Sequence, residues 1–186
     1  MNLKDYSIEV ERILLDEELL RYLYYTPKNR IDNPLDVSKT NIFDMPEDVL
    51  WDIIDNHLIP AIKIDDLDKN PICRVFYYAG IGKSSNTNYL YGSQEYIFDV
   101  FVHNDYQIRD KRLETICDRI NYLISNKRIG GIGKTLFKRK APIGAPDGYM
   151  GFRLIYEFYN ESNQRWLYGN IATRWYSFKI PLKFAR

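Results

Sequence analysis

The chain has 186 residues and a mass of 22.2 kDa, the size of one domain or of one domain with an appended arm. Its 26 basic and 25 acidic residues give a net charge of +1, and 45% of its residues are hydrophobic. These values exclude a wholly disordered chain and any overall electrostatic attraction to nucleic acid or anionic membranes. Because the apolar runs are too short to cross a bilayer and the first residues lack a signal-peptide core, we expect a soluble intracellular protein.

The first elements are predicted to be helical. Apolar residues recur at helical spacing from residue 6 to 25, and Pro27 removes the backbone donor that a longer helix would need. The polar stretch 28–41 then reads as a loop. A second, short helix follows, with Asp44 as its expected N-cap and Pro46 in its first turn.

The period of the apolar residues then changes to two, which is typical of strands. Strands are predicted over 72–78 and 92–103, with a polar, glycine-containing loop over 80–87 between them. Asn104-Asp105 is expected to cap a long helix over 107–125, the most regular apolar pattern in the chain.

Two more strands are predicted over 134–140 and 152–159, joined by a turn over 142–148 that contains Pro-Asp-Gly. This order of elements predicts an α+β fold with a mainly antiparallel sheet of about four strands and helices packed on one face. An aromatic-rich C-terminal arm follows the last strand.

The expected domain organisation is an α+β domain over 1–160 and the C-terminal arm over 161–186. The composition of 65–69 also suits a linker, so a boundary between two domains at that point is the alternative. The arm either packs on its own domain or on a neighbouring protein.

Two glycine-lysine stretches, 80–84 and 130–135, resemble phosphate-binding loops. Such a loop needs a strand before it and a helix after it, and the second stretch has the reverse order. Tyr77 and Arg128 also stand where the first glycines of the pattern belong. We therefore expect ordinary turn glycines, with a nucleotide-binding enzyme as the less favoured alternative.

The residues that most often perform chemistry are few. His57 and His103 lie in apolar periodic segments and are expected to be structural, and Cys73 and Cys117 are expected to be buried free thiols without CxxC partners. The acidic run 65–68 lacks the glycine and final glutamate of a calcium loop. We assign no catalytic, cofactor-binding or metal-binding residue, and expect no cofactor and no enzymatic activity.

The candidate functional residues are therefore those of contact surfaces. A local basic patch includes Lys127 and Arg128 and continues along the predicted strand 134–140, where lysines also protect a sheet edge from pairing with other chains. The candidate interface residues, from this strand and from the arm, are Lys134, Lys138, Arg139, Lys140, Trp166, Tyr168, Trp175, Tyr176 and Phe178.

The order of elements resembles the tail terminator, or tail completion, family of long-tailed bacteriophages, which includes the lambda tail terminator. The resemblance covers residues 8 to 160 and depends on order and spacing. Its main parts are an N-terminal helix with a leucine-rich end over 14–23, a proline-bearing loop, a strand over 74–78 and a strand over 96–103 that runs into the long helix. A hairpin closes the pattern, and its second strand, 151–158, follows Asp-Gly-Tyr.

The resemblance implies a structural virion protein of the phage neck or tail, assembled in the host cytoplasm. It would form a homo-oligomeric ring, typically of six copies, that binds the tail tube protein and the head connector or stopper protein. It implies neither a membrane partner nor specific nucleic-acid binding. The segment 41–69 and the arm exceed a minimal family member, so another neck component, a head-completion or connector protein, is the alternative.

Overall fold

The computed structural model describes residues 3–61, 72–84, 91–129 and 132–161. The possible boundary at 65–69, the acidic run 65–68 and Gly130-Gly131 lie outside these residues. So do all the aromatic residues proposed for the C-terminal arm.

The N-terminal segment forms two helices, where a single one was predicted. They are α1 (Leu3–Leu14) and α2 (Glu17–Tyr24). Asp16 separates them, because its side chain accepts a hydrogen bond from the Leu19 N–H and so begins a new helix. The same carboxylate binds Arg119 of a later helix through two 2.7 Å hydrogen bonds, so a tertiary contact fixes the break.

The loop that follows α2 lies close to the helices because Arg21 binds its backbone. The buried Arg21 guanidinium donates to the carbonyl oxygens of Pro34, Asp36 and Lys39 at 2.7 to 3.1 Å. These bonds to a charged donor hold the loop against the helices.

The second predicted helix is present as α3 (Glu47–His57), but the expected cap is wrong. Asp44 lies in a preceding 3-10 turn, η1 (Ile42–Asp44), that Asn41 caps by accepting from the Phe43 N–H. Pro46 is the N-cap residue of α3 and supplies no side-chain hydrogen bond. The proline therefore stands one position before the helix and not within its first turn.

The sheet has five strands in the order β1-β2-β3-β5-β4. They are β1 (Leu58–Ile59), β2 (Arg74–Ser84), β3 (Tyr91–His103), β4 (Ile132–Pro142) and β5 (Tyr149–Glu161). The α+β class and the mainly antiparallel pairing are confirmed, and the extra strand is β1, a two-residue parallel partner of β2. The predicted loop at 80–87 is wrong in its first part, since β2 continues to Ser84 across a bulge.

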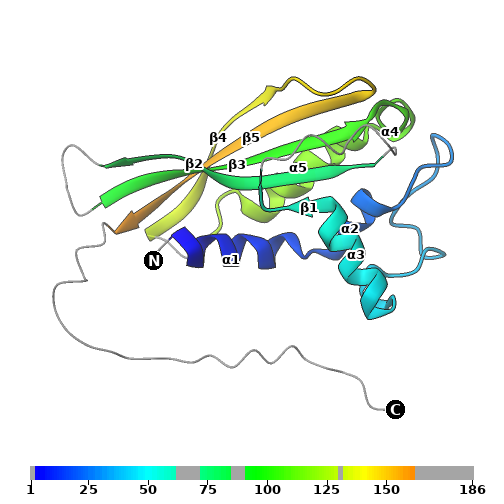
Figure 1. Ribbon diagram of the computed structural model, residues 1–186, viewed down its shortest axis with the longest axis horizontal. Coiled ribbons are helices and arrows are strands. Elements are labelled where there is room, and N and C mark those ends of the chain that lie inside the picture. Colours follow the sequence, from blue (N-terminus) through cyan, green and yellow to red (C-terminus); the bar gives the residue numbers. More distant parts are fainter. Residues whose placement is uncertain (1–2, 62–71, 85–90, 130–131, 162–186) are drawn as a thin grey trace, which may run out of the picture.

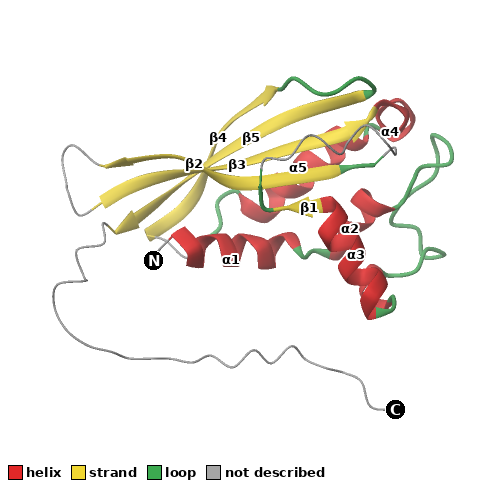
Figure 2. Ribbon diagram, viewed as in Figure 1, coloured by secondary structure: helices red, strands yellow, loops and turns green. Residues whose placement is uncertain are grey.

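Figure 2 shows the helices on one side of the sheet, and the burial pattern agrees. Phe98 and Val100 of β3 and Leu154 and Tyr156 of β5 face the helices and form the centre of the main core. The intervening side chains point to the other side, which we call the open face. This alternation follows directly from the period of two in the sequence.

The helix after β3 is also divided. α4 (Asn104–Asp110) begins earlier than predicted, with His103 as the residue whose side chain accepts at its N-terminus. Lys111 then adopts a left-handed conformation (φ 54°), and α5 (Arg112–Ile124) continues in a new direction. The apolar face of α5 covers the sheet as its pattern predicted.

Candidate interaction surfaces

The basic residues predicted as an interface lie on the exposed edge strand β4. Lys134, Lys138, Arg139 and Lys140 are all exposed, and β4 has β5 on one side and no strand on the other among the described residues. β4 is therefore an edge strand, the position at which its lysines can hinder pairing with other chains. Two irregularities in the pairing with β5 twist this edge.

The four cations do not share one face of the strand. Lys138 reaches Glu157 on the open face, with 2.5 Å between Nζ and Oε2, and Arg139 lies opposite Ile155 on the same side. Lys140 lies on the helix side, where its Nζ is 4.9 Å from the centre of the Phe152 ring. The edge is therefore basic as a whole, and no single face forms a continuous basic track.

The electrostatics of the Lys138–Glu157 pair favour its charged form. Burial opposes ionisation of Glu157, but the hydrogen bonds from Lys138, Ser93 and Tyr159 and the charge of Lys138 together outweigh it, so the pKa of Glu157 is lowered. The hydrogen bond between Lys138 and Glu157 also raises the pKa of Lys138. This pair thus offsets part of the positive charge of β4 and leaves the other three cations without a carboxylate partner in the described region.

The open face contains a charged cluster that the sequence pattern did not reveal. Asp99 is only 3% exposed, and Arg153 from the neighbouring strand binds both of its oxygens at 2.7 Å. Tyr78 donates to the same carboxylate at 2.9 Å. The pairing raises the pKa of Arg153, so the cluster is a closed ion pair across three strands with its polar groups already satisfied. A signal for it existed in Asp99 and Arg153, which interrupt otherwise apolar strands at matching positions.

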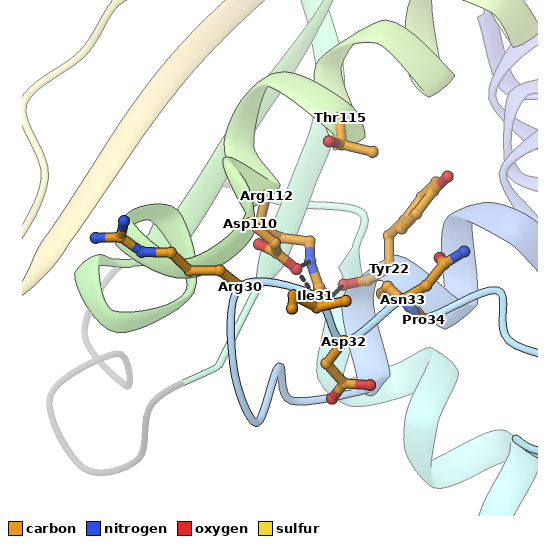
Figure 3. Close-up of a pocket in the computed structure, with 9 residues that line it drawn as sticks. All are labelled: Tyr22, Arg30, Ile31, Asp32, Asn33, Pro34, Asp110, Arg112 and Thr115. Carbon is orange, nitrogen blue, oxygen red and sulfur yellow. Dashed lines mark hydrogen bonds and ion pairs between the residues drawn. The ribbon is translucent and has the colours of Figure 1, made fainter.

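A polar pocket of about 260 Å³ lies between α2, the loop after it and α5. Figure 3 shows the Arg112 guanidinium held by Asp110 within it. Arg112 also donates to the carbonyl oxygens of Tyr22 and Tyr25, and its side chain is 1% exposed. Because these internal partners use the donor groups of the guanidinium, we interpret the pocket as a structural contact that holds the loop against the helices and not as a ligand site.

The histidines and cysteines have the structural environments that were predicted. His57 is buried, with Nδ1 2.6 Å from the carbonyl oxygen of Cys73, and burial lowers its pKa. Both cysteines are buried and free, and burial raises the pKa of each thiol to about 12, which disfavours nucleophilic thiolates.

The glycine-lysine stretches have strand geometry where the structure describes them. Gly80 to Ser84 belongs to β2, and Gly133 to Thr135 belongs to β4. Neither segment leads into a helix, so neither can aim a helix N-terminus at a phosphate group.

Within the described ranges, no three His, Cys, Asp or Glu side chains come close enough together to hold a metal ion. In that same part of the chain, no helix combines the length and apolarity needed to cross a membrane.

Comparison with known proteins gives two matches. The YomW family model matches residues 16–158. The SPbeta prophage-derived uncharacterized protein YomW of Bacillus subtilis (strain 168) is 36% identical over 156 residues, which cover 81% of this chain and 92% of that protein. The residues that the family model matches include β1 to β4, most of β5 and all helices from α2 onward. The chain belongs to the YomW family, and its relative is encoded by a prophage.

Proposed function

We propose that this YomW-family protein is a structural component of a phage neck or tail, where it forms a ring that ends tail-tube polymerisation and joins the tail to the head connector. The ring would contain six copies, bind the tube protein on one side and the connector or stopper on the other, and be assembled in the host cytoplasm for the virion.

The observation that carries the proposal is the combination of prophage relationship and element order. The relative comes from a prophage and is covered over 92% of its length. The described chain has a leucine-rich helical start, a strand β3 that leads directly into α4 and α5, and a closing β4–β5 hairpin. That is the order on which the resemblance to tail terminators depends.

The arrangement of surfaces supports a binding role. The charged groups Asp99, Arg112 and Arg153 have internal partners, while the exposed cations of β4 lie at the edge of the sheet. A ring made of one kind of subunit needs two different patches on each copy, because every copy contacts the next head to tail. Docking of such a ring on the last tube layer would cover the surface to which another tube subunit adds, without any chemical step.

A different neck component, a head-completion or connector protein, remains the second candidate. The segment 41–61 with α3 and the C-terminal arm are what a minimal terminator would lack. Both candidates are virion parts without cofactors, and they differ in whether the protein stops tube growth.

The test joins a mass measurement to a tube assay. Native mass spectrometry over a range of concentrations should show a sharp species of about 133 kDa, six times the 22.2 kDa subunit. When the protein is added to the cognate tail tube protein during polymerisation, tubes should become shorter and have the ring at one end. Tubes that grow to normal length with no bound protein would contradict the terminator role, whatever the native mass.

A further inference from the structure

The sheet has two edges of opposite charge, and the second of them was not among the predicted interfaces. Segment 41–61 contains five Asp or Glu residues and no Lys or Arg. All five carboxylates are exposed: Asp44, Glu47, Asp48, Asp52 and Asp55. We call them, together with the exposed Phe43 and Trp51, the acidic face of α3.

Helix geometry gathers most of these groups around Trp51. Glu47 and Asp48 are four and three residues before Trp51, and Asp55 is four residues after it. All three therefore lie on the same side of α3 as Trp51. Trp51 itself is 49% exposed and Phe43 is 42% exposed. The carboxylates form no ion pair in the described part of the chain. Arg74 of β2 donates instead to the carbonyl oxygen of Asn56 in α3.

The edge strand β4 has the complementary composition. Its eleven residues include Lys134, Lys138, Arg139 and Lys140 and no acidic residue. Between these cations, Leu136 and Phe137 are 43% and 42% exposed. We call these six side chains the basic edge. Leu136 lies on the open face and Phe137 on the helix side, so both faces of this edge combine an exposed apolar side chain with basic ones, and the charge of the edge is opposite to that of the acidic face of α3.

The two surfaces lie at opposite edges of the molecule. β4 is the last strand at one edge of the sheet, whereas α3 packs against β1 and β2 at the other edge. In Figure 1 the two elements lie on opposite sides of the long β3 and β5 strands. One copy therefore cannot join its own acidic face to its own basic edge, but two copies in the same orientation can.

We infer that the acidic face of α3 is the docking surface for the basic edge of a second copy of this chain. This is a heterologous contact, in which each subunit uses both surfaces, and repetition of it closes into a ring when the rotation between copies permits. The inference rests on the proposed ring and names the contact that would build it. Leu136 and Phe137 would pack against Phe43 and Trp51, while the cations face the carboxylates and an arginine such as Arg139 can also stack on the Trp51 ring.

The test exchanges the charges of the two surfaces. The acidic-face variant is Asp52→Lys with Asp55→Lys, and the basic-edge variant is Arg139→Glu with Lys140→Glu. All four side chains are exposed, so circular dichroism and thermal melting should show folded proteins. Each variant alone should need an at least 10-fold higher concentration for half-assembly in native mass measurements, since like charges then face each other. A matched control, Glu11→Lys with Asp147→Lys, reverses two exposed carboxylates elsewhere and should assemble normally.

Mixing decides whether the contact is between copies. In an equimolar mixture, the reversed acidic face of one variant can bind the reversed basic edge of the other, and the two unchanged surfaces can bind each other. Rings in which the two variants alternate should then form at the concentrations at which the wild type assembles. If both variants assemble like the wild type, or if the mixture stays dissociated, the inference is wrong while the ring proposal stands. A wild-type protein that stays at 22.2 kDa at all concentrations also overturns the inference, and the proposed function then depends on the tube assay alone.

Discussion

At the residue scale, the buried charged groups show why polar residues within apolar segments need not form an active site. Arg112 is the most buried of them, and each of its donor groups has a partner in Asp110, Tyr22 or Tyr25. Removing one member of such a set typically costs about 3–5 kcal/mol, because the remaining charge is left buried and unpaired. These groups connect elements that are far apart in sequence, and their role is to hold the domain together.

The buried His57 predicts how stability depends on pH. Burial lowers the pKa of His57 in the folded state below its ordinary value of 6.5. The unfolded chain therefore binds the proton more strongly than the folded chain does. The contribution of His57 to stability is therefore fully present above pH 6.5 and is lost as the pH falls, by up to about 1.4 kcal/mol per pH unit. Urea unfolding midpoints measured at intervals between about pH 7.5 and pH 5 should decrease accordingly.

The matched variant is His57→Gln, which can keep a donor near the Cys73 carbonyl but does not titrate. It should be less stable than the wild type at neutral pH and show a flatter dependence over the same interval. Equal slopes for the two proteins would mean that another group controls the response.

At the scale of elements, the edge strand β4 combines protection with the capacity to bind. Lysines and pairing irregularities hinder uncontrolled strand addition, and β4 has both. The backbone of the preceding turn also pairs with β4, through Asn126 N–H to Thr135 O and Thr135 N–H to Lys127 O, each at 2.8 Å. The start of β4 is therefore hydrogen-bonded on both sides, which fixes the position of its exposed side chains at the edge of the sheet.

A substitution of Lys134 in β4 tests the alternative that the protein is a nucleotide-binding enzyme. It is an exposed strand residue, and a neutral substitution at such a position removes at most about 1 kcal/mol of surface electrostatics. Lys134→Ala should melt like the wild type, weaken assembly no more than a few-fold and still cap tubes. A folded Lys134→Ala protein that has lost all function, together with nucleotide binding by the wild type, would favour a phosphate-binding loop instead.

At the scale of the whole molecule, the described residues form a core that uses no residue beyond Glu161. β5 pairs with β3 as far as Glu161, which lies opposite Tyr91, and the main core is built from residues before that point. The arm starts at the end of the sheet where β5 ends, and its proposed residues Trp166 and Trp175 lie outside the described part of the chain.

A chain that ends at Glu161 should therefore fold but assemble less well. We expect a cooperative thermal transition like that of the full chain, because the described core is retained. We also expect a higher concentration for half-assembly, because the aromatic side chains proposed for contacts with other subunits are removed. Differential scanning calorimetry and native mass measurements on the two chains check this. Loss of the cooperative transition would place the arm in the core of its own domain.

Much of the fold followed from local patterns in the sequence. The alternation in 92–103 and 152–159 placed Phe98, Val100, Leu154 and Tyr156 on one face, and burial confirms it. The Pro-Asp-Gly turn is also present, with Gly148 at φ +85° and Tyr149 N–H bound to Pro146 O. The errors occurred where tertiary contacts override periodicity, as at Asp16 between α1 and α2.

Spacing and side-chain polarity in the sequence were enough to predict the α+β class, the faces of the long strands and the burial of both cysteines. The arrangement of the strands in space was needed to show that β4 is an edge strand and that the carboxylates around Trp51 lie at the opposite edge of the sheet. It was also needed to show that Asp99, Arg112 and Arg153 are paired internally. Strand order and long-range ion pairs join residues tens of positions apart, and no local period in the sequence records which distant segments meet.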